Sequence, residues 1–220
     1  MKRYLSLLIV ALLTFISNVK AQMPLMKSVT DKVNALKQSG VDTIITYHPY
    51  CIGCILTGIS DSSKCFHNFR QYIIWKKDGE GYIQLFDECY TYLFQKPTNA
   101  LINLLSKNVG EMVQEIILPV EFEKLHNGKL ERFTSWIDHS DHLDLIFYID
   151  GEIINKPVDG YHLDTRWEDD YLRSPADANT TPPAGKAVNL NYDKNQHTYL
   201  KKLIDLLGLE ITRMNFTKAP

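Results

Sequence analysis

Residues 71–88 are QYIIWKKDGEGYIQLFDE, and this stretch predicts the fold more clearly than any other in the chain. Two short runs rich in β-branched and aromatic residues, Tyr72–Lys77 and Tyr82–Phe86, flank Asp78-Gly79-Glu80-Gly81. Glycine readily adopts the positive backbone angles of a tight turn, so the pattern is typical of a β-hairpin.

Two further strand signals support an antiparallel sheet. The apolar run Leu145–Ile149 meets Asp150-Gly151 and continues as Glu152-Ile153-Ile154, which predicts a second hairpin over residues 143–158. Residues 42–47 are rich in β-branched side chains and predict a short strand that ends at His48-Pro49.

Helices are expected where apolar residues recur at helical spacing, over residues 25–38, from Thr98 onward and over residues 196–207. We expect Gly208 to close the last helix and a short strand to follow at 210–216. Helices and hairpins alternate without the regular strand-helix-strand order of a parallel sheet. The predicted class is therefore α+β, a single domain with an antiparallel sheet built from hairpins and helices packed on one face.

The first residues are typical of a cleavable export signal. Two basic residues precede an apolar run over residues 4–16, and a small-residue junction ends at Ala21. The run is shorter than the roughly 20 apolar residues of a membrane-spanning helix. We therefore expect a signal peptide at 1–21 and one secreted or periplasmic domain at 22–220, which does not insert into the membrane after cleavage. The polar loop 174–186 is the best candidate for an internal boundary.

The charge balance excludes two classes of partner. Residues 1–21 hold three of the 24 basic residues and none of the 26 acidic ones, so the remaining 199 residues carry a net charge of −5. Proteins that bind nucleic acid or anionic membranes concentrate Lys and Arg, and this chain has no such cluster. An apolar content of 45% is sufficient for a hydrophobic core.

Four cysteines, Cys51, Cys54, Cys65 and Cys89, lie in one third of the chain. An even number of cysteines in an exported segment predicts two structural disulfides. The nested pairing joins Cys51 to Cys54 and Cys65 to Cys89, and the crossed pairing joins Cys51 to Cys65 and Cys54 to Cys89. The loop-closure model gives a stabilisation of roughly 5.5 kcal/mol for the nested scheme and roughly 7 kcal/mol for the crossed scheme. These values are too similar to choose between the two schemes.

Two other uses of the cysteines are alternatives. Cys51-Ile52-Gly53-Cys54 directly follows a predicted strand, as in a thiol-disulfide oxidoreductase, although residues 55–63 are poor helix formers and would not lower the first thiol's pKa. The four thiolates, or three with His48 or His67, also match the ligand types of a zinc-binding domain. The spacing around Cys65 and Cys89 does not match a zinc ribbon.

Residues 138–144 concentrate carboxylates and imidazoles. His142 and Asp144 point to one side of an extended chain and, with His139, are weak candidates for a metal or acid-base site. A polar loop before the second hairpin explains the same residues.

Aromatic residues gather around the first hairpin, and an exposed aromatic strand face is a common platform for protein or carbohydrate contact. The binding candidates are Trp75, Tyr82, Tyr90 and Tyr92, with core packing as the alternative role. The sequence as a whole predicts an exported, non-catalytic binding or structural module stabilised by two disulfides. Its ligand is an unknown protein or carbohydrate, and no cofactor is expected.

Overall fold

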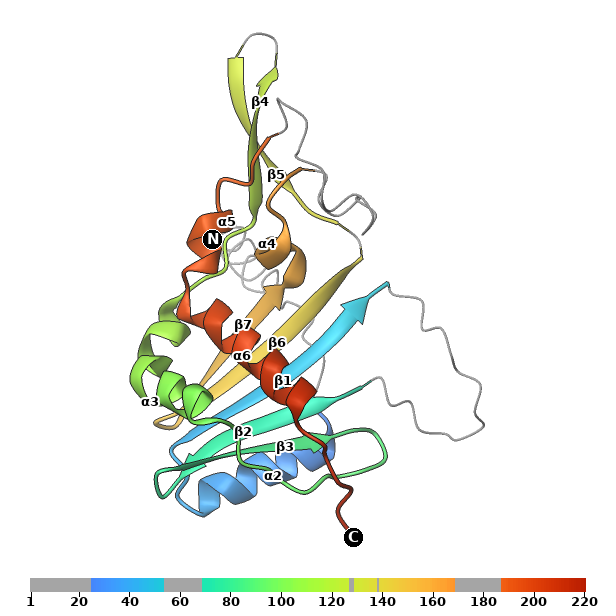
Figure 1. Cartoon of the computed structure of the whole chain (residues 1–220), viewed down its shortest axis with the longest axis vertical. Coiled ribbons are helices and arrows are strands. Elements are labelled where there is room, and N and C mark those ends of the chain that lie inside the picture. The colour runs from blue at the N-terminus through green and yellow to red at the C-terminus, as the bar shows by residue number, and fades with distance from the viewer. Residues whose placement is uncertain (1–24, 54–68, 127–128, 138, 169–186) are drawn as a thin grey trace, which may run out of the picture.

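The computed structural model describes residues 25–53, 69–126, 129–137, 139–168 and 187–220. In chain order the elements are α2 (Lys27–Gln38), β1 (Thr43–Ile52), β2 (Gln71–Lys77), β3 (Glu80–Phe86), α3 (Asn99–Gln114), β4 (Val120–His126), β5 (Lys129–Ser135), β6 (Ser140–Ile149), β7 (Glu152–Asp159), α4 (Gly160–Asp164), α5 (Tyr192–Gln196) and α6 (Tyr199–Arg213). One antiparallel sheet has the order β3-β2-β1-β6-β7, and β4 and β5 form a separate pair (Figure 1). The predicted α+β class is confirmed.

Both predicted hairpins are present and share one turn geometry. β2 pairs with β3 and β6 pairs with β7, each through a two-residue loop. Asp78 and Gly79 have φ of 51° and 82°, and Asp150 and Gly151 have 50° and 86°. Two successive residues at positive φ match the type I′ turn, whose twist suits the flanking strands.

β1 is longer than the sequence predicted and includes Cys51. Only Ile44 to Tyr47 pair with β2, whereas the β6 pairing continues to Ile52. Pro49 therefore lies where β1 has one neighbouring strand. Proline lacks a backbone N–H and is tolerated at such an edge, so it does not end the strand.

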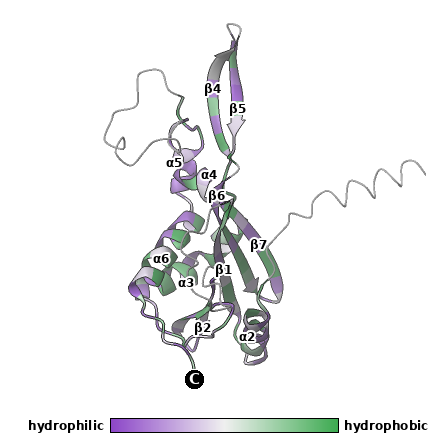
Figure 2. Ribbon diagram, turned by 90° about the vertical axis from the view of Figure 1, so that its right-hand side faces the viewer, coloured by the Kyte–Doolittle hydropathy of each residue, from purple (hydrophilic) through white to green (hydrophobic). Residues whose placement is uncertain are grey.

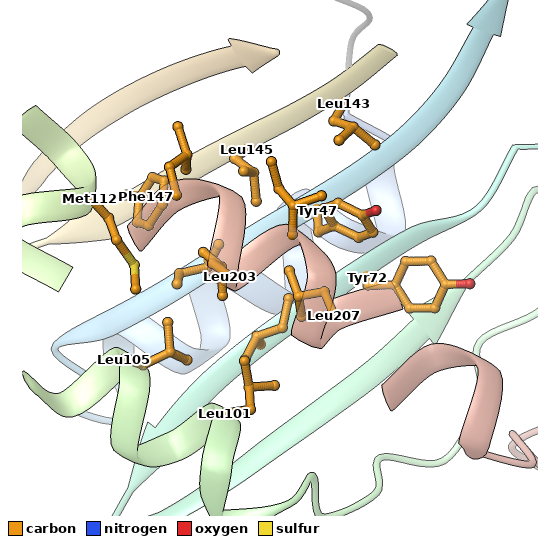
Figure 3. Close-up of a cluster of buried hydrophobic side chains, with 14 of the residues drawn as sticks. Tyr47, Tyr72, Leu101, Leu105, Met112, Leu143, Leu145, Phe147, Leu203 and Leu207 are labelled. Atoms are coloured by element: carbon orange, nitrogen blue, oxygen red, sulfur yellow. The ribbon is translucent and has the colours of Figure 1, made fainter. Parts of the chain in front are cut away.

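The main core lies between the sheet and the helices α3 and α6 (Figure 3). Alternate residues of the central strands, such as Ile45, Tyr47 and Phe147, point into this layer. They pack against Leu101 of α3 and Leu203 of α6.

The helix α2 covers the opposite face, so the expectation that all helices pack on one face is wrong for this element (Figure 2). Val29 and Val33 of α2 pack against strand residues whose side chains point to this second face of the sheet, including Ile44 and Tyr148. The continuous buried stretches of β1 and β6, residues 44–48 and 143–148, show that these strands are buried on both faces.

The end of α6 also differs from the prediction. Gly208 lies inside the helix, which continues to Arg213, and no strand forms at 210–216. Glu210 of α6 is buried and accepts a 3.0 Å hydrogen bond from the backbone N–H of Thr98. This contact with the start of α3 favours helix beyond the glycine.

The β4–β5 hairpin was not predicted, and it projects from the body of the molecule (Figures 1 and 2). Among those of its residues whose burial the structure describes, Val120 and Phe122 belong to a buried cluster, with Tyr161 of α4. Among the residues that the structure describes, no helix combines the length and apolar character of a membrane span. The predicted signal peptide, the loop 174–186, Cys54 and Cys65 lie outside the described residues.

Candidate functional site

A pocket of about 500 Å³ lies between α2 and the turn end of the first hairpin. Three aromatic residues, three lysines, one leucine and two small residues line it: Lys32, Ala35, Leu36, Ser39, Trp75, Lys77, Tyr82, Phe94 and Lys96. Two of the four predicted binding residues are therefore brought together at one concave surface.

The strand register builds the aromatic wall. Trp75 of β2 and Tyr82 of β3 are directly opposed, and their rings stack with centroids 5.3 Å apart. Phe94 meets both rings edge-on, at 6.0 Å from Trp75 and 5.4 Å from Tyr82. Trp75 is only 5% exposed, whereas Phe94 is 53% exposed, so Trp75 supports the wall and Phe94 presents it to solvent.

The lysines give the pocket a positive character. Lys32 Nζ lies 5.1 Å from the centre of the Trp75 ring, and burial lowers the pKa of this amine. Lys96 forms an ion pair with Glu80, which also accepts a 3.4 Å hydrogen bond from the Tyr82 hydroxyl. Within the described residues Lys32 and Lys77 form no ion pair. Their charges are available to an anionic ligand.

Tyr90 and Tyr92 lie away from this pocket and have structural contacts. The Tyr92 hydroxyl donates a 2.7 Å hydrogen bond to Asp87 Oδ2. Burial raises the pKa of Tyr92 to about 12, and the Asp87 carboxylate adds to the shift. The Tyr90 ring has Lys218 Nζ 3.5 Å from its centre. These two tyrosines pack against the C-terminal segment, and sequence spacing alone did not separate them from Tyr82.

A second polar cluster forms where β1 and β6 pair beyond the end of β2. His142 lies opposite Tyr50, and Asp144 lies opposite His48, so the predicted shared face of His142 and Asp144 is correct. The Tyr50 ring centroid is 5.1 Å from that of His48 and 5.5 Å from that of His142. Tyr50 also hydrogen-bonds Asp144, and burial together with this carboxylate raises the pKa of Tyr50.

His139 lies beside Gly53, directly after β1. Its ring occupies the space that a Cβ atom on Gly53 would need, with Cδ2 only 2.2 Å from the ideal position. Gly53 has φ of 73°, so glycine is required there on two grounds. No group of three or more metal-ligating side chains occurs in the described part of the chain.

Two of the four cysteines are described. Cys51 lies in β1 and Cys89 follows β3, and both are disulfide-bonded. The number of bridges and their pairing stay predictions, because Cys54 and Cys65 lie outside the described residues. The oxidoreductase and zinc hypotheses remain untested for the same reason.

Comparison with protein-family models, curated proteins and solved structures finds no match for this chain. The chemistry of the pocket is therefore the starting point for a function.

Proposed function

We propose that the chain is an exported, non-catalytic binding module, held by two disulfides, whose pocket between α2 and the first hairpin takes an acidic carbohydrate. The observation that carries this proposal is the three-ring wall of Trp75, Tyr82 and Phe94 beside Lys32 and Lys77. An oxidoreductase using Cys51 and Cys54 remains the alternative from another class.

The two halves of the pocket suit the two halves of such a ligand. An exposed aromatic ring contacts the apolar face of a sugar with little loss of side-chain entropy. A sugar carboxylate needs a cation, and hydrogen bonds to charged groups contribute about 1.5–3 kcal/mol. The net charge of the predicted mature chain is negative, so the positive charge of this pocket is a local feature.

The test measures binding of trigalacturonic acid by the fluorescence of Trp75. Replacing Trp136 and Trp167 by Phe leaves Trp75 as the single tryptophan of the chain. We expect Lys32→Gln to weaken binding about tenfold, which corresponds to about 1.4 kcal/mol, and Phe94→Ala to weaken it several-fold. Lys37→Gln is the matched control, because Lys37 is also on α2 and its Nζ lies 4.3 Å from the Tyr148 ring, outside the pocket.

The methyl ester of the same trisaccharide separates charge from shape, and we expect it to bind at least tenfold more weakly than the acid. If poly-glutamate peptide binds and the sugar does not, the ligand is a protein and the carbohydrate proposal fails. If Lys37→Gln weakens binding as much as Lys32→Gln, the pocket is not the site.

A further inference from the structure

The two edges of the β4–β5 hairpin differ in their hydrogen bonding. At the β4 edge, the Glu121 carbonyl accepts a 2.8 Å hydrogen bond from the Leu190 N–H, and the Glu121 N–H donates to Asn189 Oδ1 at 3.2 Å. At the β5 edge, no backbone hydrogen bond to a residue outside the hairpin forms in the part of the chain that the structure describes. An isolated two-stranded hairpin is at best marginally stable in water, and an unpaired edge is a template for another strand.

The register shows which residues face the open edge. Glu121 turns its N–H and C=O toward residues 189 and 190, so Thr134, its direct partner on β5, also turns these groups outward. Outward-facing groups recur at every second residue, and Arg132 and Leu130 therefore share this orientation.

The same strand carries exposed apolar side chains. Leu130 is 64% exposed, Phe133 is 39% exposed, and Trp136, directly after the strand, is 73% exposed. Large apolar residues gathered on one projecting element mark an interaction surface more often than single scattered ones.

We propose that β5 pairs antiparallel with β5 of a second copy of this chain, with Phe133 of the two copies directly opposed. A two-fold axis centred on Glu131 or on Arg132 would place identical charges opposite each other, which destabilises a strand pair. The axis centred on Phe133 opposes two aromatic rings. It also places Arg132 opposite Thr134, and Leu130 opposite Trp136.

Arg132 needs no charged partner from the second copy. Arg132 is already paired with Glu123 at 3.4 Å and with Glu121 at 3.6 Å within its own hairpin. Arg132 of one copy lies opposite Thr134 of the other, and both residues turn their backbone N–H and C=O groups toward the open edge. These two residues therefore form a hydrogen-bonded pair. Phe133 and its copy form the closer non-hydrogen-bonded pair. This self-complementarity is the reason for a second copy as the occupant.

Cysteine cross-linking tests the register directly. Opposed residues in a non-hydrogen-bonded pair have Cα atoms about 4.5 Å apart, within the range of a disulfide. Phe133→Cys should therefore give a covalent dimer on non-reducing gels, and reductant should convert this dimer to monomer. Glu131→Cys is the matched control, because it lies on the same face of β5. Its copy would be four residues or about 13 Å away, beyond disulfide reach.

A second variant covers a loss of folding in Phe133→Cys. Sedimentation velocity of the wild-type chain should show a monomer–dimer equilibrium, and Leu130→Lys should raise its dissociation constant at least tenfold. Leu209→Lys replaces a leucine on α6 that is 68% exposed and should leave it unchanged. A wild-type chain that stays monomeric at all concentrations, or equal cross-linking of Phe133→Cys and Glu131→Cys, overturns the proposal.

Discussion

His48 lies in β1 with 2% of its surface exposed, beside Tyr50 and across from Asp144. Its Nδ1 atom is 3.5 Å from the Gln71 amide nitrogen, and its Nε2 atom has no hydrogen-bond partner in the described chain. Burial lowers the pKa of His48, because a charged imidazole is poorly solvated at this position. The folded protein therefore holds this ring neutral.

This burial predicts a loss of stability in mild acid. The unfolded chain protonates His48 at its ordinary pKa of about 6.5, whereas the folded chain does so only at lower pH. The free energy of unfolding should therefore fall as the pH drops below about 6.5, by up to about 1.4 kcal/mol per pH unit. The stability linked to the neutral His48 ring is fully present above pH 6.5 and is lost as the pH falls toward the lowered pKa of the folded protein. Urea unfolding between pH 7.5 and 5 measures it.

His48→Gln should have a shallower pH dependence than the wild-type chain, because glutamine does not titrate. His197→Gln is the control, since His197 is exposed, and its pH dependence should match the wild type. Identical slopes for all three proteins would show that His48 is not the titrating group.

At the residue scale, local patterns predicted orientation but not assembly. The shared face of His142 and Asp144 follows from the two-residue period of a strand, which sequence shows directly. Their neighbours Tyr50 and His48 come from β1, far along the chain, and only the strand register brings them close. Lys32 was missed as a pocket residue because its position above Trp75 depends on how α2 docks on the sheet.

Gly208 shows how tertiary contacts change an element. A glycine after an apolar helical pattern favours a helix end, but α6 continues for five residues beyond it. Gly208 is exposed, and a Cβ atom there would meet no heavy atom within 4 Å. Gly208 therefore occupies an interior helical position at which glycine is a poor helix former.

Gly208→Ala should therefore stabilise the protein by up to about 1 kcal/mol, because alanine loses less conformational entropy in a helix. Gly151→Ala should destabilise it by a similar amount, since Gly151 has φ of 86° in the second hairpin turn. Thermal unfolding followed by circular dichroism distinguishes the two. A destabilising Gly208→Ala would indicate that α6 ends at the glycine, as the sequence alone predicted.

Elements with strong local signals were predictable from sequence. Both Asp-Gly hairpins were expected, because the turn chemistry is contained in two residues. The β4–β5 hairpin was missed although its sequence carries a strand signal, because Val120-Glu121-Phe122-Glu123 alternates apolar and charged residues and Asn127-Gly128 is a common hairpin-turn sequence. The second layer formed by α2 was indicated by continuous apolar runs in β2 and β6, Tyr72–Trp75 and Leu145–Ile149, which are typical of strands buried on both faces. The prediction of helices on one face did not use this signal.

Hydrogen bonds to buried or partly buried carboxylates join α3 and α6 at both ends of the helical layer. Glu115, which follows α3, accepts hydrogen bonds from the backbone N–H groups of Tyr199 and Leu200 at 2.9 and 2.7 Å, at the start of α6. Glu210 near the end of α6 accepts the backbone N–H of Thr98 at the start of α3. Burial raises the pKa of Glu210, but the hydrogen bonds from Thr98 and Arg213 outweigh it and the net shift is downward. Each carboxylate satisfies N–H groups that a helix start leaves open.

These two contacts predict how the whole molecule unfolds. Glu115→Gln and Glu210→Gln should each lower the free energy of unfolding by about 1–2 kcal/mol, because each weakens hydrogen bonds to a charged acceptor. The two ends of a 16-residue helix are about 24 Å apart, so the double variant should show the sum. Trp75 lies on the opposite face with α2. Its fluorescence in a chain with Trp136→Phe and Trp167→Phe reports whether that layer unfolds together with the helices.

If the molecule is one cooperative domain, Trp75 fluorescence and far-ultraviolet circular dichroism will give one coincident urea transition in every variant, shifted to lower urea in the double variant. Glu111→Gln is the control, since Glu111 is exposed on α3 and its carboxylate accepts a hydrogen bond only from the Asn108 side chain among the residues described, at 3.3 Å. A helical transition that precedes the Trp75 transition would separate the two layers. It would show that the sheet and α2 hold their structure without the α3–α6 layer. That outcome would contradict the expectation from β1 and β6, which contribute side chains to both faces of the sheet and so couple the two layers.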